Sequence, residues 1–459
     1  MTALRVAVRG LARHERPPLL ILVGLLGALA YLLWLCWAMA YASYDVWGAL
    51  IVAPVLFAIS IPLVLRLTRD DESWVTNLIL IALVCKLLAA LIRYFVVFEI
   101  YGGGDSVEYH EWGSIVAPQF RGGDFDVDIE RGVIGTGFMR ILTGVVYAFT
   151  GTTQMGGFLV YSLLGFWGLY LFYRAFRIGF PAGDHRRYAV LVFFLPSLLF
   201  WPSSIGKEAW MTFTLGLAAY GAARLFTQQR GGFALFGLGL VATLMVRPHV
   251  ALVVAIGAAA AYLVRRPKRP SLLSPAAKGV GILVLVGGAA LVMSQVETFF
   301  GVSRLDQESV DQILTTTEDR SSQGGSEYEL ERSSSPVGLA QAAVAVVFRP
   351  WPTEVNSGTA AFASLEGMFL LGLLFCSGRR FMSLPWVALR TPYLAMAMTY
   401  TVLFIYAFSS VANFGIISRQ RVQLYPFLLV LFCVLPGARP PKEEAPEPAM
   451  EELSGSTNR

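Results

Sequence analysis

Apolar segments separated by short polar stretches follow one another along almost the whole chain. Most segments are close in length to the roughly 20 apolar residues that cross a ~30 Å hydrocarbon core as a helix, and several are shorter. The pattern predicts an all-α fold, a polytopic transmembrane helical bundle with about twelve spans. The predicted spans are residues 18–41, 48–66, 74–98, 156–174, 188–202, 209–226, 232–246, 250–264, 278–295, 358–376, 391–409 and 422–436.

Composition supports a membrane environment for most of the chain. Of the 459 residues, 56% are hydrophobic and only 15% are charged, and the mean hydropathy is +0.60. Soluble domains carry about 25% charged residues. The first apolar run is too long for a signal peptide and is expected to stay as a span. The net charge of +5 comes from short basic clusters between apolar runs, so a nucleic-acid partner is not expected.

Lysine and arginine positions give the expected orientation, because cytoplasmic loops carry an excess of these residues. The basic tail, residues 1–17, is expected inside, and an even number of spans returns the C-terminus there. Residues 18–436 then form the transmembrane domain, and the proline- and glutamate-rich residues 437–459 are expected to be a disordered cytoplasmic tail. The other basic residues of the predicted inside loops are Arg66, Arg69, Arg174, Arg177, Arg186, Arg187, Arg230, Arg265, Arg266, Lys268, Arg269, Arg379, Arg380 and Arg390.

Two long segments, about 99–155 and 296–357, are expected on the outer side. Residues 133–150 and 337–349 within them are apolar enough to form helices that lie along the membrane surface. The alternative is that one of these helices crosses the membrane. If the first did so, the arginines between residues 174 and 187 would lie outside, against the positive-inside tendency. We therefore favour surface helices.

The first outer loop opens with the sequence YGGGDSVEYHEWG. Asp105 follows three glycines, which allow a sharp turn and close approach of a substrate. A carboxylate here is a candidate general base or metal ligand, with Glu108, His110 and Glu111 as neighbours. The alternative is a solvated loop. Farther on, four alternating acids are more typical of a solvated strip than of a cation site; these are Asp124, Asp126, Asp128 and Glu130.

Cations stand at several predicted outer boundaries. Lys207 and Glu208 follow a Pro/Ser/Trp segment, where the alternatives are an interfacial anchor and a phosphate contact. Arg247 and His249 flank a proline between two short spans. Charges at this depth are costly and usually functional, so Arg247 is a candidate phosphate ligand and His249 a candidate proton donor. A tight external turn is the alternative.

The second outer loop and the last span supply further polar candidates. Arg349 and Glu354 belong to the proline-rich sequence FRPWPTE, and Asn413, Arg419 and Arg421 begin the last span in NFGIISRQRVQLYPF. Arginine presents a planar fork that suits phosphate oxygens. Snorkelling toward lipid headgroups is the alternative for the closing pair. No Walker A, Rossmann or HExxH sequence is present.

These segments resemble the GT-C membrane glycosyltransferases. The resemblance rests on GGGDSVEYH, on LPSLLFWPSSIGKEAW and on NFGIISRQRVQLYPFLLVL, the last being similar to segments of bacterial O-antigen-polymerase-like proteins. It implies a bacterial plasma-membrane enzyme with both termini cytoplasmic and its active face outside. Its partners would be a polyprenyl-phosphate-linked sugar donor, a glycan or other cell-envelope acceptor, and membrane lipid.

The resemblance also implies roles for particular residues. Asp105 would activate the acceptor, and Lys207, Arg247, Arg419 and Arg421 would stabilise the lipid phosphate as it leaves. The chain lacks a large soluble C-terminal domain, so the outer loops would recognise the acceptor. No cofactor is identified; a divalent cation, Mg²⁺ or Mn²⁺, is left open because the GGGD sequence lacks a second adjacent acid.

Two other functions remain open. A polysaccharide polymerase or ligase acting on a diphosphate-linked glycan would depend more on Arg247, His249, Arg419 and Arg421 than on the first-loop acid. A lipid-linked sugar transporter or flippase would place ionisable residues within the spans. The candidates for that role are Lys86, Arg93 and Glu366.

Overall fold

The computed structural model describes residues 18–129, 132–264, 336–355, 357–411 and 413–435, together with single residues and short stretches between 279 and 315. Several predictions lie outside the described residues. They concern the N-terminal tail, most of the predicted span 278–295, residues 316–335 of the second outer loop, Glu130 and the C-terminal tail.

All regular elements of the described residues are helical. The N-terminal part contains α2 (Pro18–Tyr41), α3 (Tyr44–Leu67), α4 (Ser73–Phe95), η1 (Val96–Ile100), α5 (Asp105–Arg121), η2 (Val133–Gly137), α6 (Phe138–Thr150), α7 (Gln154–Gly179), α8 (His185–Phe194) and α9 (Pro196–Phe200). The C-terminal part contains α10 (Lys207–Phe226), α11 (Gly232–Leu244), α12 (Pro248–Val264), α15 (Pro336–Phe348), η3 (Pro352–Glu354), α16 (Gly358–Cys376), α17 (Gly378–Ala388), α18 (Pro392–Phe408) and α19 (Phe414–Leu431).

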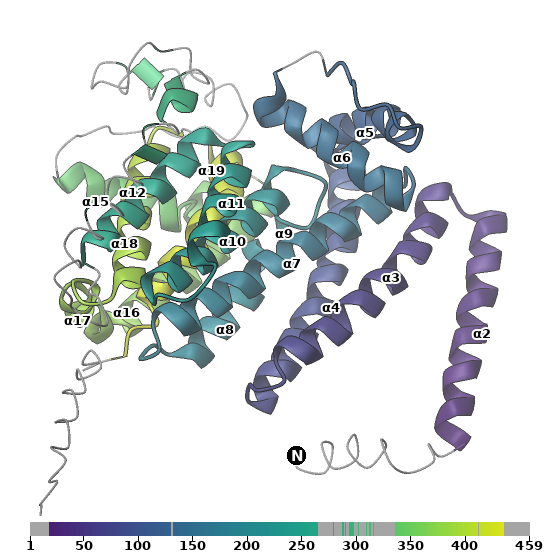
Figure 1. The fold of residues 1–459 in the computed structure, drawn as a ribbon, viewed down its shortest axis with the longest axis horizontal. Helices are drawn as coiled ribbons and strands as arrows, with labels where there is room; N and C mark the ends of the chain where they lie inside the picture. Colours follow the sequence, from purple (N-terminus) through teal and green to yellow (C-terminus); the bar gives the residue numbers. More distant parts are fainter. Residues whose placement is uncertain are drawn as a thin grey trace, which may run out of the picture.

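The helical membrane character predicted from the sequence is confirmed at this level. Six helical segments of the described chain are long and apolar enough to cross a membrane, and the bent pair α17–α18 would make a seventh. The six are Leu22–Tyr41, Tyr44–Leu67, Ser73–Ile100, Val133–Thr150, Gln154–Gly179 and Gly358–Cys376. Figure 1 shows the helices packed as one bundle with α2 standing at its edge. Accordingly, the apolar side chains along α2 are exposed.

Asp45, in the first turn of α3, joins two helix ends. Its Oδ1 accepts a hydrogen bond from the backbone N–H of Gln154, the first residue of α7, at 2.7 Å. Its Oδ2 accepts one from the Tyr94 hydroxyl, at the end of α4, at 3.5 Å. The end of α4 and the start of α7 therefore lie at the same end of the bundle. The intervening helices α5 and α6 leave and return to that end, above α3 and α7 in Figure 1.

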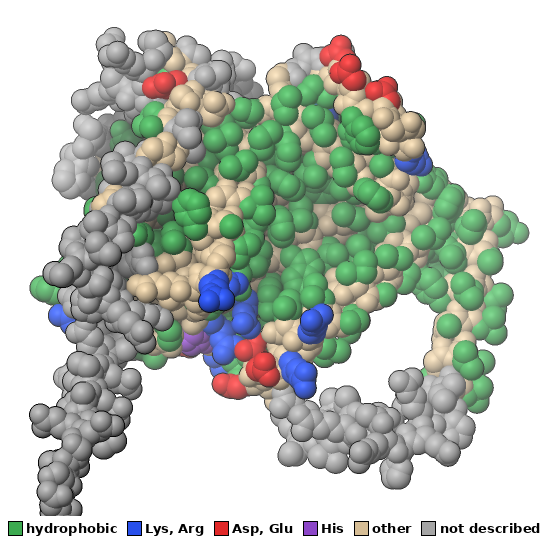
Figure 2. Space-filling view, in the orientation of Figure 1, with side chains coloured by type: hydrophobic (Ala, Val, Ile, Leu, Met, Phe, Trp, Pro, Cys, Tyr) green, Lys and Arg blue, Asp and Glu red, His purple; other side chains and the backbone are tan. Residues whose placement is uncertain are grey.

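The opposite end of the bundle carries an arginine network that joins distant parts of the sequence. Asp71, just before α4, pairs with Arg174 at 3.0 Å and with Arg177, both from the last turns of α7. Asp184 pairs with Arg380 at 3.0 Å. Lys and Arg gather along the lower edge of Figure 2. The 23 residues of α4 separate this Asp71 end from the Asp105 end by about 35 Å.

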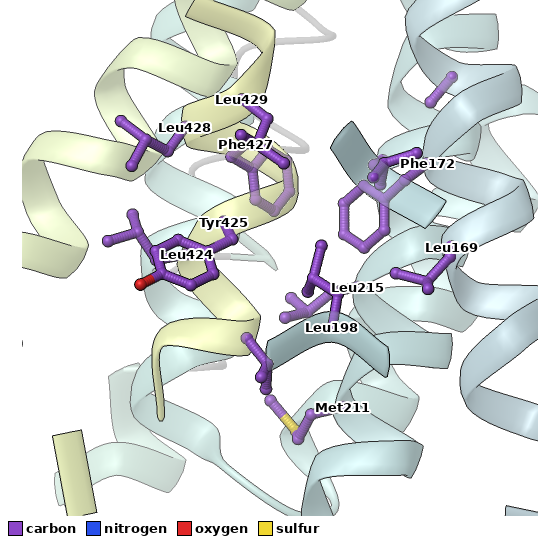
Figure 3. Close-up of a cluster of buried hydrophobic side chains, with 14 of the residues drawn as sticks. Leu169, Phe172, Leu198, Met211, Leu215, Leu424, Tyr425, Phe427, Leu428 and Leu429 are labelled. Atoms are coloured by element: carbon purple, nitrogen blue, oxygen red, sulfur yellow. The ribbon is translucent and has the colours of Figure 1, made fainter. Parts of the chain in front are cut away.

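The predicted span 188–202 is divided by a break. Helix α8 ends at Phe194, Leu195 is extended with ψ 125°, and Pro196 begins the five-residue helix α9. Proline lacks the N–H that a continuous helix would use and disfavours the helical conformation of the residue before it, which favours a break at this point. Figure 3 shows Leu198 of α9 among side chains of α7, α10 and α19, in the interior of the bundle.

Two buried side chains hold the ends of α9. At its start, Glu366 Oε2 accepts a hydrogen bond from Ser197 N at 2.6 Å. At its end, Lys86 Nζ donates to the carbonyl oxygens of Leu198 and Leu199 at 2.7 and 3.0 Å. The anion therefore meets the positive end of the short helix and the cation meets its negative end. These charges replace the backbone hydrogen bonds that the break removes.

Glycines allow α7, α10 and α11 to touch backbone to backbone. A Cβ on Gly168 would lie 2.4 Å from the Thr212 carbonyl oxygen, and one on Gly216 would lie 2.3 Å from the Gly168 carbonyl oxygen. Between α10 and α11, a Cβ on Gly221 would lie 2.2 Å from the Phe236 nitrogen. These contacts place α10, which carries Lys207 and Glu208 at its start, firmly against its two neighbours.

Candidate functional site

A chain of ion pairs crosses the Asp105 end. Arg419 Nη2 lies 2.8 Å from Asp105 Oδ2, and Arg419 Nε lies 3.3 Å from Glu208 Oε1. The same Glu208 oxygen lies 3.2 Å from Arg247 Nη2. Four residues that the sequence analysis selected from separate segments therefore meet in one site. Their settings differ, because the Asp105 side chain is 56% exposed whereas that of Glu208 is 6% exposed.

Helix starts position these side chains. Asp105 is the first residue of α5, Glu208 is the second residue of α10, and Arg247 directly precedes α12. A helix N-terminus carries unpaired N–H groups and a partial positive charge. The convergence of three such ends with several cations makes the site suited to an anion.

The glycine run before Asp105 makes the turn that the sequence analysis expected. Gly102, Gly103 and Gly104 have φ values of +68°, +127° and +155°. Residues with a Cβ rarely adopt such angles, whereas glycine does so freely. The run reverses the chain after η1 and brings Asp105 back over the end of α4.

Lys207 and His249 adjoin the chain of ion pairs. The Lys207 ammonium donates a hydrogen bond to the Thr136 hydroxyl at 3.1 Å, which links α10 to η2 before α6. His249 lies within electrostatic range of Arg247 and Lys207. Tyr109 borders the same site from α5, and burial together with Asp105 and Glu208 raises the pKa of its hydroxyl. These three residues therefore complete the polar rim.

Arg93, near the end of α4, is a site residue that the sequence analysis noted only as a charge within a span. Its guanidinium carbon lies 4.7 Å from the ring centres of both Phe200 and Trp201, which follow α9. Its electrostatic neighbours include Arg419, Glu208 and Asp105. In the sequence, Arg93 is an ionisable residue within an apolar run, and this feature alone marks it as a candidate functional residue.

An apolar hollow of about 240 Å³ lies among α6, α7 and α10. Trp210, one turn after Lys207, forms part of its wall, and the Trp210 ring lies 5.0 Å from that of Phe138 in α6. Helices α6, α7 and α10 supply the lining. The lining residues are Leu142, Val146, Val160, Tyr161, Leu163, Leu164, Trp167 and Trp210.

Two first-loop candidates face away from the ion-pair chain. Glu108 pairs with Arg140 at 2.6 Å, and this arginine also covers the Trp112 ring at 4.1 Å. His110 Nδ1 lies 2.7 Å from the Tyr147 hydroxyl, and burial lowers the pKa of the imidazole. Both contacts join α5 to α6. The structure therefore gives Glu108 and His110 partners within the α5–α6 hairpin.

The remaining candidates are engaged at α15 and α19. Arg349 pairs with Glu354, and this pairing, with the Trp351 N–H, lowers the Glu354 pKa despite its partial burial. Arg421 is 1% exposed and donates to the carbonyl oxygens of Val346, at 2.6 Å, and Arg349. Asn413 caps α19 by accepting from Ile416 N at 3.1 Å. The structure does not bring these residues into the ion-pair chain.

Asp105, Glu108 and Glu208 each pair with an arginine. Among the described residues, no group of three or more His, Cys, Asp or Glu side chains has an arrangement that could hold a metal ion. The acidic strip at Asp124, Asp126 and Asp128 is exposed. A divalent cation therefore gains no fitted ligand set from the described side chains.

No protein-family model, no curated protein and no solved structure matches this chain.

Proposed function

We propose that the chain is a membrane glycosyltransferase that moves a sugar from a polyprenyl-phosphate-linked donor to an acceptor. The observation that carries the proposal is the pairing of an exposed carboxylate, Asp105, with Arg419 at 2.8 Å beside buried cations and an apolar hollow. A phosphate headgroup suits the cations, and an isoprenoid chain suits the hollow. The exposed carboxylate is open to an acceptor from the water side.

Asp105 acts as general base. Its carboxylate takes the proton of an acceptor hydroxyl while that oxygen forms a bond to the anomeric carbon. The bond from this carbon to the phosphate oxygen breaks, and its electron pair remains on the lipid phosphate. The site cations stabilise that developing charge more strongly in the transition state than in the donor. Direct displacement of this kind inverts the anomeric centre.

Glu208 has a different role from Asp105. Its buried carboxylate accepts from both Arg247 and Arg419, so it fixes the direction in which these two guanidinium groups point. Two carboxylates in unlike settings commonly divide such roles. Lys207 lies one turn before Trp210, which lines the hollow, and would meet a lipid phosphate whose chain enters there. Glu208 is thus a positioning residue and Lys207 a phosphate ligand.

We also propose that the Asp105 end faces outward, with about twelve segments crossing the membrane and both termini inside. The concentration of arginine at the Asp71 end supports this orientation. The Asp45 contacts hold the end of α4 and the start of α7 at the same end of the bundle. Helices α5 and α6 between them must therefore either both cross the membrane or both stay on the outer side, and we favour the outer side. Helix α5 carries Asp105, Glu108, His110, Glu111 and Arg121. The proposed location is a bacterial plasma membrane.

The alternative functions draw less support from the site. A polymerase using a diphosphate-linked glycan shares the cations but would also depend on Arg421, and this side chain is bound to backbone carbonyls. A transporter would use charges within the spans, but two of its three candidates, Lys86 and Glu366, hold α9. The third, Arg93, is a neighbour of the Asp105–Arg419–Glu208 ion pairs. Sugar transfer makes the fullest use of Asp105.

Replacement of the base tests the proposal. Purified protein in liposomes would receive a polyprenyl phosphate bearing a radiolabelled sugar, with envelope extract as acceptor, and label transfer would be measured. Asp105→Asn should reduce transfer by about 10²- to 10⁴-fold, the usual contribution of a general base. Asp124→Asn serves as the control, because Asp124 is an exposed acid just after the end of α5. Near-wild-type transfer by Asp105→Asn would overturn the assignment.

A further inference from the structure

Two buried arginines beside the Glu208–Arg419 pair hold N–H groups without a hydrogen-bond acceptor among the described residues. They are Nε and Nη1 of Arg93 and Nη1 of Arg247. Arg140 Nε in α6 also lacks an acceptor there, but that arginine pairs with Glu108. Arg93 is 8% exposed and Arg247 is 7% exposed. Arginine usually saturates its donors when buried, as Arg421 does at the end of α15.

The positions of these arginines relate the open donors to the site. Arg93 lies within electrostatic range of Arg419, Glu208 and Asp105, and Arg247 bonds to Glu208 directly. The aromatic rings of Phe200 and Trp201 hold the Arg93 guanidinium but accept no conventional hydrogen bond. The two arginines therefore approach the Glu208–Arg419 pair from α4 and from the start of α12.

Charge is also unbalanced among the described residues of this site. Four cations, Arg93, Lys207, Arg247 and Arg419, face two carboxylates, Asp105 and Glu208. An excess of two positive charges remains. Burying unpaired charge is expensive unless a partner supplies acceptors. The site is therefore complementary to a ligand with two negative charges and several oxygens.

We propose that Arg93 and Arg247 form a binding site for a phosphate monoester dianion at the end of an isoprenoid chain. The inference rests on the proposed function, where this ion is the leaving group, and it adds Arg93 as a ligand. A phosphodiester donor carries one negative charge and its monoester product carries two. The site thus binds the dianionic monoester, which forms as the sugar departs, more tightly than the singly charged donor.

Binding of short analogues to the full-length protein in detergent tests this inference. The probes are farnesyl phosphate, its methyl ester with a single charge, farnesol and inorganic phosphate, each followed by calorimetry and by thermal unfolding. Farnesyl phosphate should bind most tightly. Arg93→Gln should weaken that binding by about 10- to 100-fold, the effect of losing a charge-assisted contact, and Arg93→Lys should restore part of it.

Arg224→Gln is a matched control. Arg224 also has a buried Nε without a described partner, but it lies in the last turn of α10, about 25 Å along the helix from Lys207. Its replacement should leave farnesyl phosphate binding unchanged. Unaltered binding in Arg93→Gln, or equal binding of the ester and farnesyl phosphate, would overturn the inference. Inorganic phosphate binding as tightly as farnesyl phosphate would exclude the lipid as the source of the anion.

The same measurements separate this inference from the proposed function. If Arg93-dependent binding of farnesyl phosphate is found but no sugar is transferred from any lipid-linked donor, the anion site stands and the transferase proposal fails. If transfer depends on Asp105 but Arg93→Gln binds the analogue normally, the transferase stands and the role of Arg93 fails.

Discussion

The two charged ends of the bundle both contain arginines and carboxylates, but their surplus cations are exposed at one end and buried at the other. At the Asp71 end, Asp71 and Asp184 each pair with arginine, and surplus cations such as Arg66, Arg69 and Arg379 are exposed. At the Asp105 end, the surplus cations include Arg93 and Arg247, which are buried. Water and lipid headgroups neutralise exposed charge at little cost, whereas buried charge needs a specific partner.

The difference shows that the number of arginines at a membrane surface says little about anion binding. Burial and free donors distinguish a binding site from a topological signal. The Asp71 end fits the usual basic inner surface, and the Asp105 end fits a site that a ligand completes.

Loss of a carboxylate should cost much more at the Asp105 end. Glu208→Gln leaves Arg247 and Arg419 without their shared buried partner and should lower the free energy of unfolding by about 3–5 kcal/mol. Asp71→Asn should cost only about 1 kcal/mol, because its arginine partners are 28% and 34% exposed. Denaturant unfolding in detergent would measure both. Equal losses would remove the distinction between the ends.

Buried cations with and without partners should respond differently. Lys86→Met removes charged donors from the Leu198 and Leu199 carbonyls and should destabilise the protein by about 2–4 kcal/mol. Arg93→Met, in the absence of phosphate compounds, should change stability by no more than about 1 kcal/mol, since the lost contacts with Phe200 and Trp201 are offset by removal of a buried charge whose Nε and Nη1 lack acceptors among the described residues. A loss from Arg93→Met as large as that from Lys86→Met would contradict the assignment of Arg93.

Two glycines allow the same backbone change to be made at each end. Gly102 has φ +68° and Gly231, in the turn after α10, has φ +77°, and a Cβ on either would meet nothing within 4 Å. Each change to alanine should therefore cost about 1 kcal/mol of stability. Only Gly102→Ala should also reduce sugar transfer, by about 10-fold or more, because it displaces Asp105. Equal transfer by the two variants would separate Asp105 from catalysis.

The smallest effect concerns pH at the α5–α6 hairpin. Burial lowers the pKa of His110 in the folded protein below its usual value of 6.5. The unfolded chain then binds the proton more readily than the folded protein. The contribution of His110 to the free energy of unfolding is therefore complete above about pH 6.5 and declines as the pH falls. His110→Gln should flatten the fall in unfolding free energy between pH 7 and 5. An unchanged pH profile would show that His110 adds nothing to this decline.

Much of this arrangement could be predicted from local sequence. Apolar run length gave the helical membrane character, and charges at run boundaries selected Asp105, Lys207, Arg247 and Arg419. The proline at position 196 indicated a possible break, yet the apolar residues on both sides favoured one continuous span. Its position inside the bundle depends on Lys86, which is distant in sequence.

Other contacts depend on three-dimensional packing that no local pattern encodes. Arg421 and Arg419 lie two residues apart, but one turns toward the carbonyls at the end of α15 and the other toward Asp105. A guanidinium group binds carbonyl, carboxylate and phosphate oxygens with similar geometry. Only the fold determines which of them each arginine meets.

The backbone contacts among α7, α10 and α11 have a mechanical consequence. Helices that touch through Gly168, Gly216 and Gly221 have almost no space in which to slide or rotate. Lys207 and Glu208 therefore stand on a stiff support, whereas Asp105 and Arg419 are carried by α5 and α19. If the proposed function holds, opening of the site would move Asp105 and Arg419 relative to Lys207 and Glu208, and the Asp105–Arg419 ion pair would have to break.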